Sequence, residues 1–303
     1  VGSVLTDGSR LIIEALARSG ADAFIGYPIT PANLLYLYGS QRMELMLPAP
    51  DEITTLQWMA GLAATRRLPV TATSFPGYAL MLESVNMAYM MELPMVIVLV
   101  QRLGPATGTA TCGAQGDLLL LRGSISGGHP LPVLGTSDFA DCYALAGKAA
   151  QIAVELRTPV VLLTSKEEVM TQKSFRYDLL DEISEVVWPD YTLDCEYKSY
   201  KATDGVPDFL AVTQTRYQVR LNASTHDELG LLQHNTPQAM ANTHRLEDKV
   251  LERMQDHVYY EYDKQQGAEC LVVAYGITSS AAREAVIGIR NQGKKVSLLI
   301  PKT

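Results

Sequence analysis

The residues with the clearest chemical potential lie in a loop that follows a short apolar strand. The stretch Ala23-Phe-Ile-Gly-Tyr27 leads into Pro-Ile-Thr-Pro at residues 28–31. Each proline fixes its own φ angle and keeps the preceding residue out of the helical region, so this loop is predicted to be rigid. Thr30 is then held extended, with its hydroxyl and amide groups free to face a ligand. Open α/β sheets bind their ligands at this edge, where parallel strands end.

A carboxylate, Glu52, opens a long apolar helical stretch, and two interpretations of it stay open. In the first, Asp51 and Glu52 are helix-entry charges that complement the helix dipole. In the second, Glu52 is a buried carboxylate that holds a proton on a cofactor ring nitrogen. Local sequence alone favours helix entry, whereas the apolar residues on both sides of Glu52 favour burial.

Two further strand ends carry polar loops. The apolar run Met95–Val100 ends in Gln101-Arg102 and continues into a loop rich in Gly, Pro and Thr. An arginine in that place can grip a carboxylate through two parallel hydrogen bonds, or it can simply face solvent. The segment 71–77, Thr-Ala-Thr-Ser-Phe-Pro-Gly, also ends a strand in small hydroxylated residues and a turn. Three consecutive strand ends of this kind predict one shared crevice.

A parallel sheet is needed to position these loops, and residues 1–174 show the pattern of one. Helical and strand patterns alternate, and the strands are continuous apolar runs, as is typical of strands covered on both faces. The expected fold class is therefore α/β, with a doubly wound, mostly parallel sheet. The expected helices cover 6–19, 32–47, 53–66, 79–91 and 138–156, and the expected strands cover 23–27, 70–74, 95–100 and 160–164.

The pattern changes after this first domain. In 175–267 the apolar periodicity fades, and this irregular connecting region is predicted to hold short strands at 209–213 and 217–220 and an amphipathic helix at 245–260. Residues 268–303 read as the start of a second α/β domain, with strands at 269–275 and 295–300 around a helix at 279–291. So few βα units cannot bury both faces of a sheet, so we expect either more chain after it or packing on another surface.

Composition argues against several function classes. Acidic residues outnumber basic ones by 33 to 25, the net charge is −8, and no basic block is present, so nucleic-acid binding is disfavoured. The longest apolar run is far below the about 20 residues that span a bilayer, and no leader-like segment opens the chain, so we expect a cytoplasmic protein without a membrane partner. The cysteines form no CxxC pair, which predicts no metal site and no cysteine-ligated cluster. Reduced and mostly buried thiols are expected at Cys112, Cys142, Cys195 and Cys270.

Taken together, these motifs resemble the α subunit of the 2-oxoacid:ferredoxin oxidoreductases, the family that includes the pyruvate, 2-oxoglutarate and branched-chain 2-oxoacid enzymes. The matching motifs follow one another in order and cover essentially the whole chain. They lie at residues 26–31, 51–53, 71–74, 101–108, 114–118, 158–165, 225–230 and 270–302.

Members of this family cleave a 2-oxoacid with thiamine diphosphate, pass two electrons through iron–sulfur clusters to ferredoxin, and form an acyl-CoA. The resemblance implies that the first domain is a pyrimidine-type thiamine-binding domain and that the second is similar to a transketolase C-terminal domain. Glu52 would contact the aminopyrimidine N1′ and serve in proton transfer. Thr30 and Arg102 would hold the substrate carboxylate and oxo group. The remaining cofactor contacts implied are Pro28, Ile29, Thr73 and Ser74.

The half of the site that holds the diphosphate is not apparent in this sequence. In the family it needs a Gly-Asp-Gly opening and a later Asn that hold Mg²⁺, whereas the Asp-Gly pairs here, at 7–8 and 204–205, lie at no expected sheet edge. The resemblance therefore implies a β subunit that carries the diphosphate and Mg²⁺, with [4Fe-4S] clusters on partner chains and γ or δ subunits as further candidates. The chain is expected to be inactive alone.

Two alternatives stay open beside this reading. One is the pyrimidine-domain subunit of another thiamine enzyme, of the 2-oxoacid dehydrogenase E1 type. The other is a non-catalytic paralogous subunit that kept the fold. The sequence does not select a particular 2-oxoacid, because that choice depends on the shape of the pocket.

Overall fold

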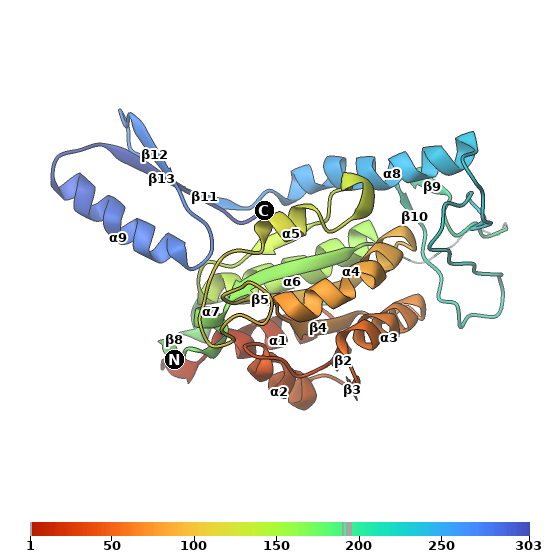
Figure 1. Cartoon of the computed structure of the whole chain (residues 1–303), viewed down its shortest axis with the longest axis horizontal. Helices are drawn as coiled ribbons and strands as arrows, with labels where there is room; N and C mark the ends of the chain where they lie inside the picture. The colour runs from red at the N-terminus through yellow and green to blue at the C-terminus, as the bar shows by residue number, and fades with distance from the viewer. Residues whose placement is uncertain (1, 190, 192–195) are drawn as a thin grey trace.

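The chain is built around a six-stranded sheet in a computed structural model that describes residues 2–189, 191 and 196–303. The strand order is β3-β2-β4-β5-β7-β6, and neighbouring strands all run parallel (Figure 1). This confirms the α/β class and the parallel sheet expected from the sequence. The strands are β2 (Ala23–Gly26), β3 (Leu45–Pro48), β4 (Pro69–Thr73), β5 (Met95–Gln101), β6 (Val133–Gly135) and β7 (Pro159–Ser165).

Helices cover both faces of this sheet, as a doubly wound fold requires. Helices α1 and α6 pack together on one face, and α3 and α4 pack together on the other. None of the helices in the described part of the chain is long and apolar enough to cross a membrane. The helices of this unit are α1 (Gly8–Arg18), α2 (Asn33–Arg42), α3 (Glu52–Ala64), α4 (Phe75–Met90), α5 (Leu118–Arg122), α6 (Phe139–Leu156) and α7 (Lys166–Met170), with a 3-10 turn at Ser126–Gly128.

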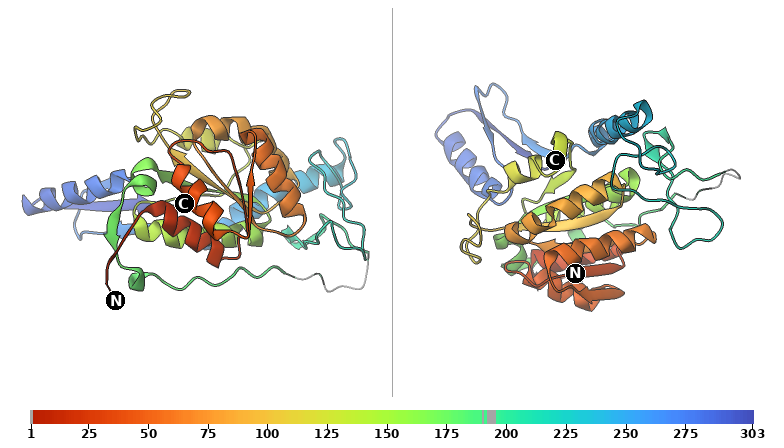
Figure 2. Two further views of the ribbon diagram at one scale, coloured as in Figure 1. Left: turned by 90° about the horizontal axis from the view of Figure 1, so that it is seen from below. Right: turned by 45° about the vertical axis from the view of Figure 1, so that its right-hand side comes forward.

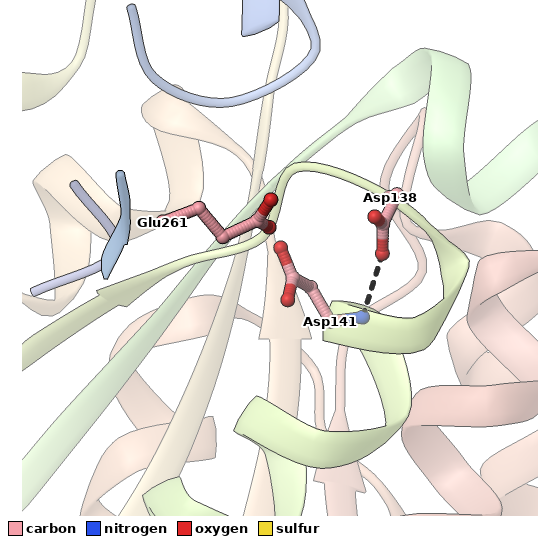
Figure 3. Close-up of side chains that lie close together, drawn as sticks. All are labelled: Asp138, Asp141 and Glu261. Atoms are coloured by element: carbon pink, nitrogen blue, oxygen red, sulfur yellow. Dashed lines mark hydrogen bonds between the residues drawn. The ribbon is translucent and has the colours of Figure 1, made fainter. Parts of the chain in front are cut away.

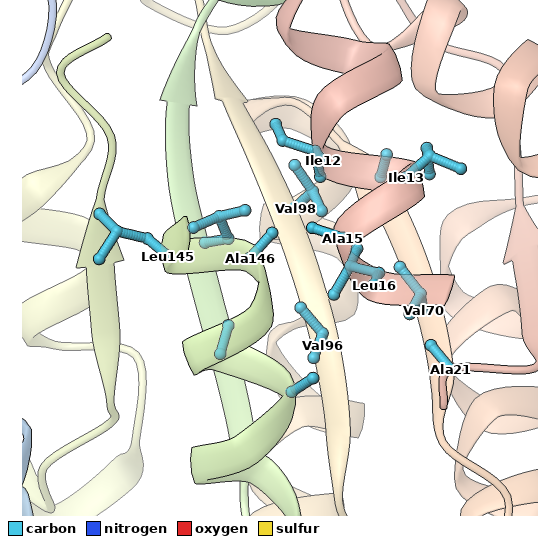
Figure 4. Close-up of a cluster of buried hydrophobic side chains, with 14 of the residues drawn as sticks. Ile12, Ile13, Ala15, Leu16, Ala21, Val70, Val96, Val98, Leu145 and Ala146 are labelled. Carbon is cyan, nitrogen blue, oxygen red and sulfur yellow. The ribbon is translucent and has the colours of Figure 1, made fainter. Parts of the chain in front are cut away.

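Strand β5 shows why its sequence is apolar without interruption. Because successive side chains of a strand point to opposite faces, Val96 and Val98 enter the core beside α1 and α6, whereas Ile97 and Leu99 enter the core beside α3 and α4. Figure 4 shows the first of these cores, with residues of α1 and α6 closing over β5. A strand that is buried on both faces needs an apolar residue at every position.

The connecting region is less regular. Strands β1 (Val4–Thr6) and β8 (Lys173–Phe175) form an antiparallel pair, and β9 (Ala202–Asp204) pairs with β10 (Val206–Pro207). A 3-10 turn spans Tyr177–Leu179, and the long helix α8 (Pro237–Arg253) ends in another 3-10 turn at Met254–His257.

A separate three-stranded sheet lies near the C-terminus. Its central strand, β13 (Val296–Pro301), pairs antiparallel with β11 (Tyr260–Asp263) and parallel with β12 (Cys270–Val273). Helix α9 (Thr278–Asn291) packs against β13, and the unit projects from the main body (Figures 1 and 2). Strand β11, which lies before residue 268 in the sequence, is part of this sheet.

Two local predictions in the first domain were wrong. The helix expected over 32–47 ends at Arg42, and residues 45–48 form the edge strand β3 alongside β2. A short apolar run does not distinguish a helix end from a strand. The turn expected at residues 75–77 is instead the first turn of α4. Proline is tolerated there because the first N–H groups of a helix have no intrahelical acceptor.

Other predictions failed in the later part of the chain. Residues 209–213 and 217–220 form loops rather than strands, and α8 begins earlier than the helix expected at 245–260. Thr236 caps α8 by accepting a hydrogen bond from the Ala239 N–H at 3.3 Å, a start signal that the apolar pattern alone did not reveal. Among the cysteines, Cys142 is buried but Cys112 and Cys270 are exposed, contrary to expectation, and Cys195 lies outside the described residues.

Candidate active site at the carboxyl edge of the large sheet

Three of the strand ends singled out from the sequence lie side by side. Strand β4 is the neighbour of both β2 and β5, and the three strands are parallel, so the segments that follow them emerge at one edge of the sheet. These segments carry Thr30, Ser74 and Arg102, respectively. The start of α3, with Glu52, follows β3 at the same edge.

Arg102 and Thr30 are in direct contact. The Arg102 Nη1 donates a hydrogen bond to the main-chain carbonyl of Thr30 at 2.5 Å. Arg102 is only 7% exposed, and its Nε is buried without a hydrogen-bond partner among the described residues. Burial lowers the pKa of the Arg102 guanidinium from its usual value. The arginine expected either to grip a ligand or to face solvent is therefore buried at the site, with a donor left over.

The other loop residues occupy different positions. Thr30 is half-buried and precedes a cis peptide bond to Pro31. Ile29 is half-buried against the core beside α1 and α6, and its carbonyl accepts a hydrogen bond from the Ala32 N–H at 2.8 Å. Pro28 is exposed. The structure thus brings Thr30 and Arg102 together, and it leaves Pro28 on the surface of the loop.

The structure separates the two neighbouring carboxylates at the start of α3. Asp51 is the helix cap, because its side chain accepts a hydrogen bond from the Thr54 N–H at 2.7 Å. That backbone hydrogen bond also lowers the pKa of Asp51. Glu52 is 6% exposed, and within the described part of the chain its carboxylate makes no hydrogen bond or ion pair. The helix-entry role therefore belongs to Asp51, and Glu52 is a buried carboxylate without a structural partner.

Glu52 is closely packed against the start of α4. A Cβ atom added at Gly77 would lie 2.6 Å from Glu52 Oε1 and nearer still to Thr73 Oγ1. Only a glycine at this position lets the end of β4, the start of α3 and the start of α4 approach so closely. Glu52 and Thr73, which are far apart in the sequence, are thus brought to one point.

Two buried hydroxyl groups near this point have no hydrogen-bond partner in the described part of the chain. Ser74 is the N-cap residue of α4 but makes no side-chain capping bond, and its Oγ is buried and unpaired. The Oγ1 of Thr71 is likewise buried and unpaired, whereas that of Thr73 makes a long hydrogen bond of 3.4 Å to the Ser74 carbonyl. Buried polar atoms without partners are rare in folded proteins and are common where a ligand completes the hydrogen bonding.

Sequence reasoning missed one polar residue of the region as a candidate. Asp117 is buried at the end of the loop that follows Arg102, its Oδ2 has no partner among the described residues, and burial raises its pKa. The available signal was a lone carboxylate in front of the apolar run 118–121, a pattern that is also typical of an ordinary helix start.

A cluster of three carboxylates elsewhere has a structural explanation. Figure 3 shows Asp138, Asp141 and Glu261 close together. Asp138 caps α6 through the Asp141 N–H at 2.9 Å. The Lys302 ammonium lies between the other two, 2.6 Å from Asp141 Oδ1 and 2.5 Å from Glu261 Oε1. This lysine supplies the positive charge that the cluster needs, so we do not assign it to a metal.

Comparisons with known proteins give matches over most of the chain. The family model described as pyruvate flavodoxin/ferredoxin oxidoreductase, thiamine diphosphate-binding, matches residues 14–244. The 2-oxoglutarate synthase subunit KorA of Methanothermobacter thermautotrophicus is 30% identical over 304 residues, which cover 96% of this chain and 79% of that protein. The ketoisovalerate oxidoreductase subunit VorB of the same organism is 28% identical over 305 residues, covering 99% of this chain and 79% of that protein.

A solved structure extends the comparison to the fold. The 2-oxoglutarate:ferredoxin oxidoreductase from Magnetococcus marinus, solved with 2-oxoglutarate, coenzyme A and succinyl-CoA bound, superposes with a TM-score of 0.89 at 26% identity. The match covers 99% of this chain but 54% of that chain, so this chain spans about half the length of that neighbour. The chain therefore belongs to the pyruvate flavodoxin/ferredoxin oxidoreductase family, as an α-subunit-type chain of the 2-oxoacid:ferredoxin oxidoreductases.

Proposed function

We propose that this chain binds the pyrimidine side of thiamine diphosphate and the 2-oxoacid in an enzyme that oxidatively decarboxylates a 2-oxoacid to an acyl-CoA, with ferredoxin as the electron acceptor. The observation that carries the proposal is that two polar groups lie at one edge of the sheet. One is the buried, unpartnered Glu52 beside Gly77, and the other is Arg102 held against Thr30.

The residues at the Glu52 end fit the pyrimidine of the cofactor. Glu52 is an acceptor without a partner among the described residues, Gly77 lets its carboxylate pack close to Thr73, and Ser74 offers a buried hydroxyl that needs a partner. When bound, thiamine diphosphate supplies the nucleophilic carbon and the electron sink that decarboxylation requires. Glu52 would hold a proton at the aminopyrimidine N1′, and Thr73 and Ser74, with Pro28 and Ile29 of the first loop, would line the cofactor.

The residues at the Arg102 end fit a carboxylate. Arginine has five N–H donors, and Thr30 occupies only Nη1, so the other donors remain for an anionic substrate. In a buried place such a charge-assisted pairing is stronger than in water. Every 2-oxoacid carries the same carboxylate and oxo group, so we propose the class of substrate and not a particular acid. The two relatives described above, named for 2-oxoglutarate and for ketoisovalerate, match this chain almost equally well.

A partner subunit is the second part of the proposal. The helices α3 and α4, which begin at the Glu52 end, carry exposed apolar side chains, among them Ile53, Trp58 and Leu80. An apolar patch of this kind next to a site supports a protein partner that covers it. We propose a β subunit that carries the diphosphate, the Mg²⁺ site and [4Fe-4S] clusters, and a cytoplasmic assembly that uses ferredoxin and CoA, with γ or δ subunits as further candidates. The coenzyme A in the Magnetococcus marinus enzyme supports CoA as the acyl acceptor.

The test is a Glu52→Gln substitution in the reconstituted complex, because glutamine keeps the size of the side chain but cannot exchange a proton. We expect turnover of a panel of 2-oxoacids, measured as ferredoxin or viologen reduction, to fall by about 10²–10⁴-fold. Glu83→Gln on the exposed side of α4 is the matched control and should leave turnover unchanged. Near wild-type turnover of the Glu52→Gln complex would overturn the proposal.

The two alternatives give different results in the same assay. A complex that transfers its acyl group to lipoyl acceptors and reduces no viologen would belong with the 2-oxoacid dehydrogenase E1 type. A complex that binds no thiamine diphosphate and turns over no 2-oxoacid would identify the chain as a non-catalytic subunit.

A further inference from the structure

The loop that follows Arg102 is tied to the C-terminal three-stranded unit. This loop, residues 103–117, leads from the end of β5 to the start of α5, and residues 103–109 and 111–113 are exposed. Main-chain hydrogen bonds shape its exposed part: the Leu103 N–H donates to the Cys112 carbonyl at 2.8 Å, the Cys112 N–H to the Thr109 carbonyl at 3.0 Å, and the Thr109 N–H to the Leu103 carbonyl at 3.2 Å. These bonds lie within residues 103–112, so the position of the loop relative to the sheet depends on contacts at its two ends.

A single phenol group meets both ends of the loop. The Tyr275 hydroxyl donates to the main-chain carbonyl of Gln115 at 2.9 Å and lies 3.4 Å from Gln101 Oε1. Gln101 immediately precedes Arg102, and Gln115 lies near the far end of the loop. Tyr275 itself follows β12, the strand of the small sheet. The Tyr275 hydroxyl, which belongs to the C-terminal unit, thus contacts the residues at both ends of the loop, Gln101 and Gln115.

The Gln115 side chain makes two further hydrogen bonds to the C-terminal unit. Its Nε2 donates to the Tyr275 carbonyl at 2.8 Å, and its Oε1 accepts a hydrogen bond from the Thr278 hydroxyl. Gly276, with φ of +61°, makes room for this amide, since an added Cβ would collide with Gln115 Nε2. Both polar ends of the Gln115 side chain are therefore satisfied by the turn that opens α9.

The ring and the hydroxyl of Tyr275 have separable roles. The ring is half-buried against the core beside α3 and α4, so it contributes packing between the two units. The hydroxyl donates the hydrogen bond to the main-chain carbonyl of Gln115. A change to phenylalanine removes that bond and keeps the ring, which makes the effect of the bond measurable without a large cavity.

We propose that Tyr275 and Gln115 are positioning residues that hold the Arg102 loop in its binding conformation and thereby set the affinity for the 2-oxoacid. This inference rests on the proposed function, in which Arg102 binds the substrate carboxylate. The C-terminal unit then acts on the substrate side of the site and has no role in the proton transfer at Glu52. A loop that is held in place before binding costs less conformational entropy when the substrate arrives.

The first experiment separates KM from kcat in the reconstituted complex. For Tyr275→Phe we expect KM for the 2-oxoacid to rise by up to about tenfold, with kcat changed less than twofold, because the loss of one hydrogen bond changes a free energy by about that much. Tyr262→Phe, an exposed tyrosine of the same small sheet, is the matched control and should leave both constants unchanged. A fall in kcat with unchanged KM, or no change in either constant, would overturn the proposal.

A second pair of variants tests the same link from the side of Gln115. Thr278→Val removes the hydroxyl that donates to the Gln115 side chain, whereas Thr278→Ser keeps it. We expect the valine variant to raise KM and the serine variant to restore the wild-type value. Equal KM values in both variants would contradict a role for this hydrogen bond in positioning the loop.

A readout that does not depend on turnover keeps this inference distinct from the proposed function. Hydrogen exchange of residues 103–113, measured by mass spectrometry on the complex without substrate, should become faster in Tyr275→Phe and remain unchanged in α1 and α6. If the Glu52→Gln complex retains its turnover, the proposed function fails. If exchange in this loop increases in Tyr275→Phe, the link between Tyr275 and the loop stands regardless of that result. Unchanged exchange in Tyr275→Phe would reject the link itself.

Discussion

The two sheets of this protein differ in how completely helices cover their faces. In the large sheet, β5 and β7 are buried along their whole length because helices cover both faces. In the small sheet, α9 covers one face, and the side chains on the other remain exposed, with Leu271 at 51% and Val273 at 59%. Tyr260 and Tyr262 of β11 are exposed as well.

This difference explains where the site can lie. A carboxylate such as Glu52 or a guanidinium such as Arg102 needs a rigid and largely dry surround, and the doubly covered sheet provides one at its carboxyl edge. The small sheet has no comparable interior. Its connecting segment instead brings Tyr275 and Thr278 into contact with the loop that follows Arg102.

The largest effect expected from this comparison is on stability. Leu99→Ala in β5 removes a fully buried side chain between two layers and should lower the free energy of unfolding by about 3 kcal/mol. The same substitution at Leu271 in β12 should change it by less than about 0.5 kcal/mol, because that side chain is already half in water. Denaturant unfolding of the purified chain measures both values. Equal losses would show that the uncovered face is packed in solution.

A second contrast concerns two carboxyl groups whose pKa values are shifted in opposite directions. In the large unit, burial raises the pKa of Glu168 to about 7, although hydrogen bonds from Ser165, Thr136 and Thr164 oppose this. The folded state therefore binds a proton more tightly than the unfolded state. The stabilisation is complete below about pH 4.5 and is lost as the pH rises to about 7, a change on the order of 3 kcal/mol.

Glu168→Gln tests this assignment. The variant carries no titrating group at this position, so its free energy of unfolding should fall less than that of the wild type between pH 4.5 and pH 7. Urea unfolding at a series of pH values gives the two slopes. Parallel slopes would mean that Glu168 does not bind a proton in the folded protein in this range.

In the small unit, Glu261 should respond with the opposite sign. Burial acts to raise its pKa, but hydrogen bonds from Lys302 and Arg283 outweigh burial and lower it. The stabilisation from Glu261 is thus present above about pH 4.5 and is lost as the pH falls through its lowered pKa. Glu261→Gln should flatten the acid side of the stability profile and leave the range from pH 4.5 to pH 7 unaffected.

The sequence predicted the doubly covered part of the molecule best. Continuous apolar runs such as that of β5 indicate buried parallel strands, and the three polar strand ends were correctly expected at one sheet edge. The failures lie where local pattern competes with tertiary pairing. Strand β3 was mistaken for the end of a helix, and β11 was missed, because its residues alternate between exposed tyrosines and carboxylates and it exists only through pairing with β13.

The placement of the candidate residues was predictable to the extent that it follows from strand ends. Glu52, Thr30 and Arg102 were singled out as a carboxylate, a hydroxyl and a guanidinium next to strand ends, and the structure places all three at one edge of the sheet. The contact between Tyr275 and Gln115 was not, because it joins residues 160 positions apart through a main-chain carbonyl and an amide, which leave no local signal. Whether Asp51 or Glu52 caps α3 could also not be decided before the hydrogen bond from the Thr54 N–H to Asp51 was known.

The smallest expected effect on stability comes from Asp51, the helix cap next to Glu52 in the large unit. Asp51→Ala removes the cap of α3 and should lower the melting temperature by less than Leu99→Ala does, while the turnover of the complex is retained. Asp51→Asn should restore the stability, since asparagine caps helices as well as aspartate does. Thermal unfolding and the ferredoxin reduction assay on the same variants measure the two quantities. If Asp51→Ala abolished turnover in a folded complex, the carboxylate assigned to the helix cap would have a part in the chemistry, and Glu52 would no longer be the only acid–base candidate at the start of α3.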